Sequence, residues 1–482
     1  PANAAAGNAC APAKYTQVSA GSSHTCALKS DGSVWCWGYN LYGQLGNNTN
    51  DKQNTPVPVS GLAGGVKSIS AGSNHTCAVK ADGSAWCWGD GRRGRLGYGG
   101  EDHKQVPVQV VEIGSDVKSI SAGGSHTCAV KTDGSAWCWG TNHAGQLGDD
   151  TIENRLKPAE VSGFSTGVST ISAGNIHTCA VKTDGSAWCW GAAAEGRLGN
   201  GSSRNSEHTP VAVDNLGSNV ADISAASSHT CALKTDNSVY CWGRHTFGEL
   251  GIGEIVSGPA HRTKPVKVIG ISGVQSITTN TWSTCAVKGD RSPWCWGAGW
   301  SVYLGEDSKD HKFEPTPVLG LTAIKDISAG SKHTCALKEN GRIWCWGAGE
   351  LGELGQGEFA DSKDPVQVSD PSGGNTDASG DAGSCSLDGI TLADGDSEDF
   401  FSESSPSCGT SCDDVKLSRT CIAGNLIGNT DFEFANCTER TDCGTGASCT
   451  TIDGEVKPDG WKGEMFGAPS VSCLRSCIKN VT

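Results

Sequence analysis

Short runs of alternating large and small side chains flank a Ser-Asp-Gly turn, and the first such unit runs from His24 to Gly38. Both runs are rich in residues that favour β-strands, and the turn glycine can adopt the positive φ that a tight hairpin requires. If Asp31 lies at the tip, residues at equal distances from it face each other. Cys26 then lies opposite Cys36, at the separation that a cross-strand disulfide needs.

The two faces of this predicted hairpin differ in chemistry. Side chains alternate between the faces of a strand, so His24 and Leu28 share the face of the disulfide. Trp35 and Trp37 point to the other face, over small partners on the opposite strand. One face is therefore crosslinked and the other carries two indoles. We expect such a sheet to be stable only where something covers both faces.

The same hairpin occurs seven times. Its first cysteine recurs every 50 to 54 residues, and a second cysteine follows ten residues later each time. Each repeat also has a strand-like run before the hairpin, a Gly-x-Leu-Gly turn after it and a short strand with proline and valine. A period near 50 with about four strands predicts an all-β, seven-bladed β-propeller over residues 15–370, with one hairpin disulfide per blade. The paired cysteines are Cys26 and Cys36, Cys77 and Cys87, Cys128 and Cys138, Cys179 and Cys189, Cys231 and Cys241, Cys285 and Cys295, and Cys335 and Cys345.

The ends of the repeat region predict how the ring closes. The first strand-like run covers residues 15–21, and the last repeat ends at residues 365–368. We expect these two segments to meet and to complete one blade from both ends of the region. Closure of this kind removes the exposed edge of the sheet.

The repeat Ser-Ala-Gly-x-x-His-Thr-Cys-Ala-Leu-Lys-x-Asp-Gly-Ser-x-Trp-Cys-Trp-Gly, followed by Asn-x-x-Gly-Gln-Leu-Gly, resembles the regulator-of-chromosome-condensation repeat family. Members of that family form seven-bladed β-propellers. The paired cysteines are similar to those of secreted bacterial members and unlike the nuclear ones. We therefore do not expect the exchange-factor activity of the nuclear members, which needs an intracellular GTPase. The family also includes a plant ultraviolet photoreceptor, but here the repeated tryptophans indicate packing between blades rather than light absorption.

Composition narrows the compartment and the partners. The 482 residues include 24 cysteines, and the seven hairpin pairs use fourteen of them. Such pairs are typical of exported proteins, so we expect a secreted or cell-surface location. The net charge of −15 argues against nucleic-acid binding through a basic surface. No apolar run of about 18 residues is present, so we expect no transmembrane segment.

The segments outside the propeller are also distinctive. Residues 1–14 read as a small polar tail that contains Cys10, and residues 371–383 read as a Gly/Ser/Asp linker. Residues 384–482 contain nine cysteines and predict a small disulfide-rich β domain, which resembles a module of bacterial surface proteins. Nine is an odd number, so Cys10 is a candidate for an inter-domain or inter-subunit disulfide.

Few residues suggest chemistry. Six repeated histidines fall one per blade, too far apart for a shared metal ion, so we expect each to form a hydrogen bond between strands. They are His24, His75, His126, His177, His229 and His333. We find no catalytic motif and no cofactor site. The candidate binding residues lie on loops: Arg92, Arg93 and Arg95 in the second repeat, and Trp300 and Tyr303 in the divergent sixth repeat, where Trp282 also departs from the pattern. The alternatives are a solvated turn for the arginines and structural drift for the sixth repeat.

Two functions remain open from the sequence. The first is an extracellular, non-enzymatic binding or adhesion module whose loop face holds a protein or glycan at the cell surface. The second is a structural subunit of an extracellular filament or surface assembly, in which the tail and the Cys-rich region link copies of the chain. The variable loops favour the first function, and the two ends of the chain favour the second.

Overall fold

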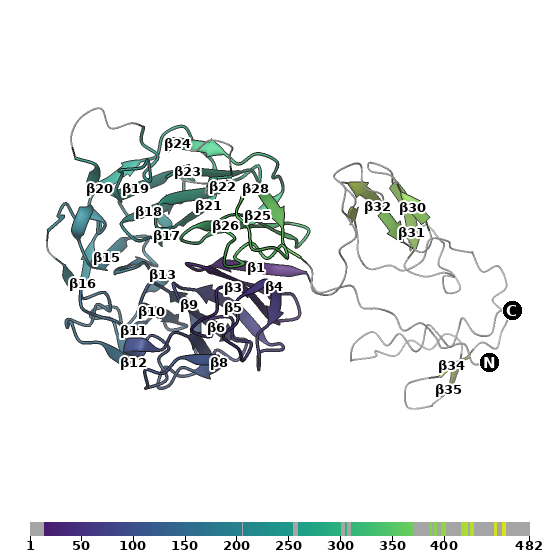
Figure 1. The fold of residues 1–482 in the computed structure, drawn as a ribbon, viewed down its shortest axis with the longest axis horizontal. Helices are drawn as coiled ribbons and strands as arrows, with labels where there is room; N and C mark the ends of the chain where they lie inside the picture. The colour runs from purple at the N-terminus through teal and green to yellow at the C-terminus, as the bar shows by residue number, and fades with distance from the viewer. Residues whose placement is uncertain are drawn as a thin grey trace. The chain divides into compact units, whose positions relative to one another are not determined.

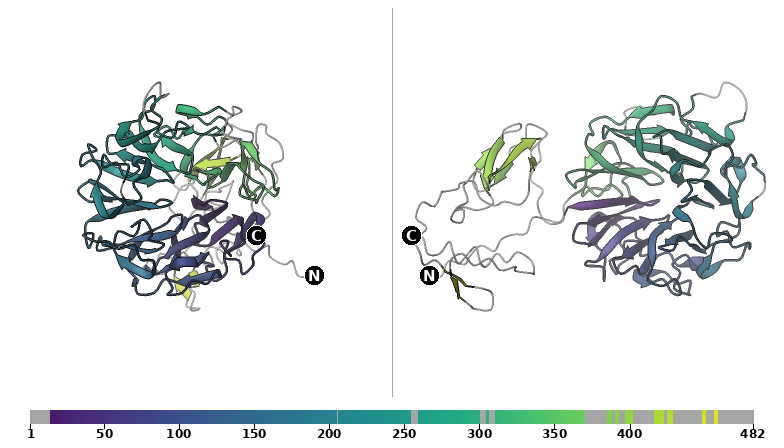
Figure 2. Two further views of the ribbon diagram at one scale, coloured as in Figure 1. Left: turned by 60° about the vertical axis from the view of Figure 1, so that its left-hand side comes forward. Right: turned by 180° about the vertical axis from the view of Figure 1, so that it is seen from behind.

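Seven four-stranded antiparallel sheets form a ring (Figure 1). The computed structural model describes residues 14–204, 206–253, 259–299, 304–305 and 310–369, and the backbone of seven short strands between residues 385 and 458. The sheets follow one another around the ring in chain order, as the colour gradient in Figures 1 and 2 shows. The predicted seven-bladed β-propeller is confirmed.

Each blade is built from four consecutive strands. Blade 1 is β1 (Tyr15–Ala20), β2 (His24–Lys29), β3 (Val34–Gly38) and β4 (Gln53–Pro58); blade 2 is β5 (Val66–Ala71), β6 (His75–Lys80), β7 (Ala85–Gly89) and β8 (Lys104–Gln109); blade 3 is β9 (Val117–Ala122), β10 (His126–Lys131), β11 (Ala136–Gly140) and β12 (Arg155–Glu160); blade 4 is β13 (Val168–Ala173), β14 (His177–Lys182), β15 (Ala187–Gly191) and β16 (Glu207–Ala212). Blade 5 is β17 (Val220–Ala225), β18 (His229–Lys234), β19 (Val239–Arg244) and β20 (His261–Lys267); blade 6 is β21 (Val274–Thr279), β22 (Ser283–Lys288), β23 (Pro293–Gly297) and β24 (Lys312–Pro317); blade 7 is β25 (Ile324–Ala329), β26 (His333–Lys338), β27 (Ile343–Gly347) and β28 (Ser362–Gln367). Two short 3₁₀ helices, η1 (Arg92–Gly94) and η2 (Ala194–Gly196), lie in turns.

The central hairpin of each blade has the predicted register. In blade 1, Cys26 pairs with Cys36 and Thr25 with Trp37 across β2 and β3. A disulfide joins the two cysteines, and the other six blades carry the equivalent bridge. The Ser-Asp-Gly turn sets this register, because Asp31 accepts hydrogen bonds from the backbone and the hydroxyl of Ser33.

Neighbouring blades cover each other's faces, so both faces of each hairpin are packed, as the sequence predicted. The disulfide of Cys26 and Cys36 packs with Leu28 against Trp88 of blade 2. Trp37 packs in the same way against the disulfide of blade 7. The tryptophan that directly follows the second cysteine of each hairpin is fully buried, and these residues are Trp37, Trp88, Trp139, Trp190, Trp242, Trp296 and Trp346. The predicted role of these indoles in packing between blades is confirmed.

The prediction for ring closure is wrong. Among the described residues, no blade combines strands from the two ends of the region, because β1 pairs with β2 of its own repeat and β28 pairs with β27 of its own repeat. The four strands of each repeat form an unbroken antiparallel meander, so each described strand of the propeller already belongs to the sheet of its own repeat. Blade 1 instead meets blade 7 through side chains, and the core cluster at this junction joins Tyr15 and Val18 to Leu337 and Val368.

A closed ring of hydrogen bonds runs through the innermost strands. In each blade a serine or threonine hydroxyl accepts a hydrogen bond from a backbone N–H of the next blade. The seven pairs are Ser19 to Ala71, Ser70 to Ala122, Ser121 to Ala173, Ser172 to Ala225, Ser224 to Thr279, Thr278 to Ala329 and Ser328 to Ala20. The last pair closes the ring between blades 7 and 1.

Replacing a buried indole tests this packing. Trp139 is fully buried, and its Nε1 donates to the carbonyl of Arg95 at 3.0 Å. We expect Trp139→Ala to lower the free energy of unfolding by about 3–5 kcal/mol, because it removes a large packed side chain and one hydrogen bond. Trp137→Ala is the matched control, since that half-buried indole lies under Lys131 near the blade surface. Urea denaturation measures both losses, and equal losses would contradict the packing model.

Residues 376–482 form a separate compact unit. Its described backbone forms three small antiparallel sheets. They contain β29 (Cys385–Leu387) and β30 (Ile390–Leu392), then β31 (Ser397–Phe401), β32 (Lys416–Ile422) and β33 (Asn425–Gly428), and finally β34 (Ser448–Thr450) and β35 (Val456–Pro458). The predicted disulfides of this unit lie outside the described residues, as does Cys10. The predicted domain boundaries stay predictions. Among the described residues, no helix is long and apolar enough to cross a membrane.

Candidate functional site

One face of the ring gathers the variable parts of the chain. The turn from β1 to β2 and the residues after β3 lie at the same end of the blade, since the N–H of Tyr39 donates to the carbonyl of Ser23 at 2.8 Å. The Asp-Gly hairpin tips lie at the other end, where the N–H of Val66 donates to the carbonyl of Gly32. We name the first end the mouth face and the second the tip face. The predicted crowding of the variable loops at one face fits this arrangement.

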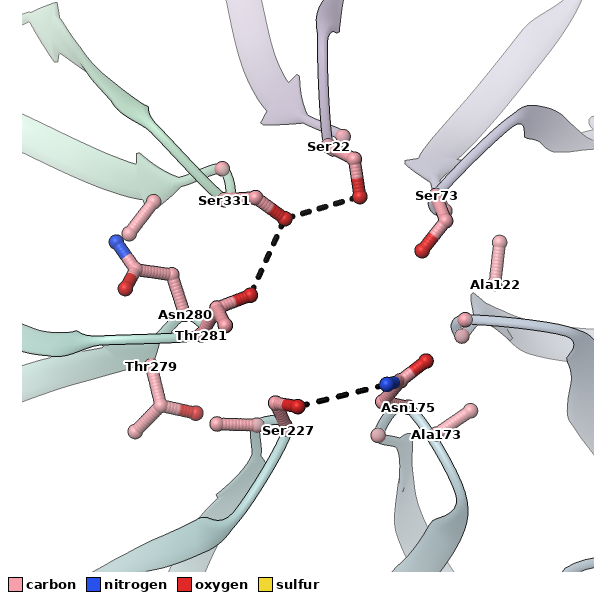
Figure 3. A pocket seen from close by; sticks show the side chains of 18 of the residues that line it. Ser22, Ser73, Ala122, Ala173, Asn175, Ser227, Thr279, Asn280, Thr281 and Ser331 are labelled. Carbon is pink, nitrogen blue, oxygen red and sulfur yellow. Dashed lines mark hydrogen bonds between the residues drawn. The ribbon is translucent and has the colours of Figure 1, made fainter. Parts of the chain in front are cut away.

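A cavity of about 210 Å³ lies where the seven blades meet on the mouth face (Figure 3). It is lined by small residues from the turns between the first two strands of every blade. Thr281 donates to Ser331 at 3.2 Å, and Ser331 donates to Ser22 at 2.9 Å. Asn175 donates to Ser227 at 3.4 Å on the opposite side. No charged side chain lines this cavity in the described part of the chain.

The repeated histidines connect neighbouring blades below this cavity. The Nε2 atom of His24 forms a hydrogen bond with the Thr76 hydroxyl at 2.9 Å. That hydroxyl donates in turn to the carbonyl of Gln44, which also accepts from Trp88 Nε1. We call this set of contacts the relay. The predicted hydrogen-bonding role of the histidines is therefore confirmed. The same histidine–threonine bond joins His75 to Thr127, His126 to Thr178, His177 to Thr230, His229 to Thr284 and His333 to Thr25.

Burial keeps these histidines neutral. Desolvation lowers the pKa of His24 and of His126 to about 3, and that of His333 to about 4. A neutral imidazole can share one hydrogen with threonine and does not place a charge between the blades. Among the described residues, no three potential ligands gather as a metal site would require.

The three arginines of blade 2 have different environments. Arg95 is buried, and both it and Arg92 form salt bridges with the buried carboxylate of Asp90, at 3.1 and 2.6 Å. Burial acts to raise the pKa of Asp90, but the hydrogen bond from Arg92 and the charge of Arg95 outweigh it and lower that pKa. Arg92 also covers the ring of Tyr42. Arg93 is exposed at a positive φ of 58°. Their binding roles stay predictions, and only Arg92 and Arg93 lie at the surface.

A second cluster joins blades 5 and 6 beside the cavity. The guanidinium of Arg244 lies 4.4 Å from the Trp282 ring centroid, and Phe247 meets the same indole edge-on at 5.7 Å. His311 lies 5.1 Å from the Phe247 ring. We call Arg244, Phe247, Trp282 and His311 the rim cluster. Each of the four is partly exposed. Trp300 and Tyr303, which the sequence also indicated here, lie outside the described residues.

Two contacts hold the rim cluster in place. Arg244 forms a salt bridge with the buried Glu249 at 2.7 Å and donates to the carbonyl of Thr281 at 2.6 Å. Asn280 accepts hydrogen bonds from the backbone N–H groups of Trp282 and Ser283. The indole is therefore attached to a fixed turn and stacked on a fixed cation, an arrangement that preorganises an exposed aromatic side chain.

The sequence interpretation missed most of this cluster. It noted Trp282 but not Arg244, Phe247 or His311. One available signal was the tripeptide Asp-His-Lys, which occurs at residues 102–104 and again at 310–312. In both places the histidine Nδ1 accepts a backbone N–H from the turn of its own blade. In both places it also faces an aromatic ring of the preceding blade, Tyr42 or Phe247.

The fold and the site define a disulfide-bonded β-propeller that presents a polar cavity and an aromatic rim on one face. The chain belongs to the RCC1-like domain family, because the sequence model of that family matches residues 1–259. Regulator of chromosome condensation (RCC1) repeats also match residues 236–287, 294–337 and 340–379.

Two curated relatives are similar over part of their lengths. The ultraviolet-B receptor UVR8 of Arabidopsis thaliana is 35% identical over 249 residues, which is 50% of this chain and 56% of the receptor. The human E3 ubiquitin-protein ligase HERC2 is 30% identical over 309 residues, which is 62% of this chain and 6% of the ligase. The chain thus spans about half of the first relative and a small part of the second.

A solved structure shows the same fold. Yeast RCC1 (Prp20), in the crystal structure with Kap60 bound, superposes with a TM-score of 0.63 at 22% identity. That match covers 71% of this chain and 84% of the solved chain.

Proposed function

We propose that this chain is an extracellular, non-enzymatic binding module that holds a protein partner on its mouth face. The observation that carries the proposal is the rim cluster, in which a partly exposed tryptophan stacks on an arginine and meets a phenylalanine edge-on beside a polar cavity. Binding hot spots are enriched in tryptophan and arginine held in this preorganised way.

Relatives support binding to proteins as the general role. Yeast Prp20 has been crystallised with Kap60 bound to it, and Prp20 also has binding properties toward Gsp1p and histones. Those partners belong to Prp20. For this chain we propose only the class of partner, a protein, met by the same kind of scaffold.

The disulfides support the extracellular location. Fourteen sulfur atoms are paired and almost fully buried in the propeller. Repeated structural bridges of this kind form in oxidising compartments. Adhesion to a glycan and assembly into filaments stay predictions, and the filament function depends on Cys10 and the Cys-rich unit, whose side chains lie outside the described residues.

The test compares partner binding by the full chain and two matched variants. Immobilised wild-type protein is exposed to the extracellular material of the source, and the retained protein is purified and its affinity measured. We expect Trp282→Ala to weaken binding at least about 30-fold, the loss typical of a hot spot. Leu319→Ala removes an equally apolar but exposed side chain near the tip face and should leave the affinity unchanged.

Melting temperatures within about 2 °C would show that both variants are folded. Equal binding by all three proteins would refute the role of the rim cluster. A retained glycan in place of a protein, abolished by the same variant, would refute the partner class.

A further inference from the structure

The junction between blades 6 and 7 lacks the histidine–threonine hydrogen bond that joins the other blades. Six junctions have a histidine–threonine hydrogen bond of 2.8–2.9 Å. At this junction Ser283 stands in the histidine position and faces the threonine position, Thr334. Both residues are fully buried, and neither hydroxyl has a hydrogen-bond partner in the described part of the chain. Two polar groups are thus buried without compensation at this junction, whereas each of the other six leaves one, the Nδ1 atom of its histidine.

A second substitution accompanies the first. Five blades have glycine three residues before the histidine, and a Cβ atom at Gly21 would lie only 2.5 Å from the His24 ring. Blade 6 has Asn280 at this position, and its side chain holds the N–H groups of the Trp282 turn. A methyl group is tolerated there, because blade 5 has alanine beside its histidine. Blade 6 thus has a longer residue, asparagine, in the glycine position and a shorter residue, serine, in the histidine position. The hydrogen bonds that Asn280 accepts from the Trp282 turn take the place of the histidine–threonine bond.

The innermost ring of hydrogen bonds is also longest at this junction. The N–H of Ala329 lies 3.3 Å from the Thr278 hydroxyl, whereas the other six equivalent contacts are 2.9–3.0 Å. This contact is made by different strands from those that carry Ser283 and Thr334. Two separate layers of the junction are therefore weaker than their counterparts.

We propose that the propeller opens at the junction between blades 6 and 7, with water entering between Ser283 and Thr334. The alternative by chain connectivity is the junction of blades 7 and 1, which no described peptide segment bridges. That junction has a complete relay, because His333 bonds to Thr25 at 2.8 Å and the Glu353 carbonyl accepts from Trp37 at 2.8 Å. Its inner contact, from Ala20 to Ser328, is 2.9 Å.

Opening at this junction has a consequence on the mouth face. The hydrogen bond from Thr281 to Ser331 crosses it and borders the central cavity (Figure 3). Local opening therefore widens the cavity directly beside Trp282. This inference goes beyond the proposed binding function and does not depend on it, since it concerns the free protein.

Hydrogen exchange of backbone amides in the whole protein tests the proposal. We expect the amide of Ala329 to exchange at least about tenfold faster than those of Ala122 and Ala173, which make the equivalent contact in complete junctions. The double variant Asn280→Gly with Ser283→His supplies the missing histidine–threonine hydrogen bond and should remove that difference. His126→Ser creates the same defect between blades 3 and 4 and should speed exchange at Ala173 alone.

The outcomes separate the alternatives. Uniform exchange around the ring, or fastest exchange at Ala20, would overturn the proposal. So would an unchanged Ala329 rate in the double variant, once its melting curve shows that it is folded. If the double variant does not fold, the His126→Ser protein still decides, because unchanged exchange at Ala173 would refute the role of the relay.

Discussion

Acidification from pH 7 to pH 4 is expected to unfold the propeller. Desolvation lowers the pKa of His24, His126 and His229 to about 3 and that of His333 to about 4, and the pKa values of His75 and His177 fall well below the usual 6.5. These folded-state values lie below the unfolded value. The stability from neutral burial is therefore complete above pH 6.5 and is lost as the unfolded chain binds protons below it.

The expected loss is large because six groups act together. At pH 4, each histidine with a pKa near 3 lowers the free energy of unfolding by about 3 kcal/mol, at about 1.4 kcal/mol per pH unit. Burial raises the pKa of Asp222 to about 6 and that of Glu353 to about 7. Those two carboxyl groups act in the opposite direction and offset about two of the six histidines. The remaining loss is comparable with the whole stability of a typical domain.

Urea denaturation between pH 7.5 and pH 4 measures this dependence. The glutamine of the His126→Gln variant cannot bind a proton. The slope of its free energy of unfolding against pH should therefore be smaller than that of the wild type by the equivalent of about one proton. Its stability at pH 7.5 should be lower. The control is His143→Gln, which changes an exposed side chain and should keep the wild-type slope. A slope in the His126 variant equal to that of the wild type would contradict the assignment.

Local features of the blade were predictable from the sequence because they depend on short-range geometry. The ten-residue spacing across Asp31 places Cys26 opposite Cys36 in any tight hairpin, and the structure has this register. The period of the repeat then indicates the number of blades. The relay histidines were predictable only in outline, because the threonine partner lies one full repeat away.

Ring closure and the rim cluster were harder to predict for one reason. Both depend on contacts between different repeats, which a single repeat does not encode. Whether β1 completes blade 1 or blade 7 is decided by pairing along the whole meander. Arg244 and Phe247 meet Trp282 only because the curvature of the ring brings blades 5 and 6 together. The pattern around Trp282 indicated a divergent blade but not the residues that would surround it.

Removing a single hairpin disulfide is expected to destabilise the propeller without changing its fold. The bridge between Cys128 and Cys138 closes a loop with a sequence separation of 10. A loop of that size restricts the unfolded chain by about 2–3 kcal/mol, so Cys128→Ala with Cys138→Ala should lower the free energy of unfolding by at least that amount. The pair Cys179 and Cys189 has the same separation and should give the same loss.

The seven bridges together are expected to decide whether the chain folds at all. Seven loops of this size contribute about 15–20 kcal/mol in the chain-entropy model, more than the total stability of most domains. Reduction in urea, followed by removal of the urea with reductant present, should therefore leave the propeller unfolded. The oxidised protein should refold.

Val130→Ala is the control for lost packing, because it removes buried volume beside an intact bridge. Like the wild type, this variant should refold only when it is oxidised. Peptide mapping under non-reducing conditions should recover each bridge within its own blade. Free thiols at these positions, bridges between blades, or full refolding under reduction would each contradict the role assigned to the disulfides.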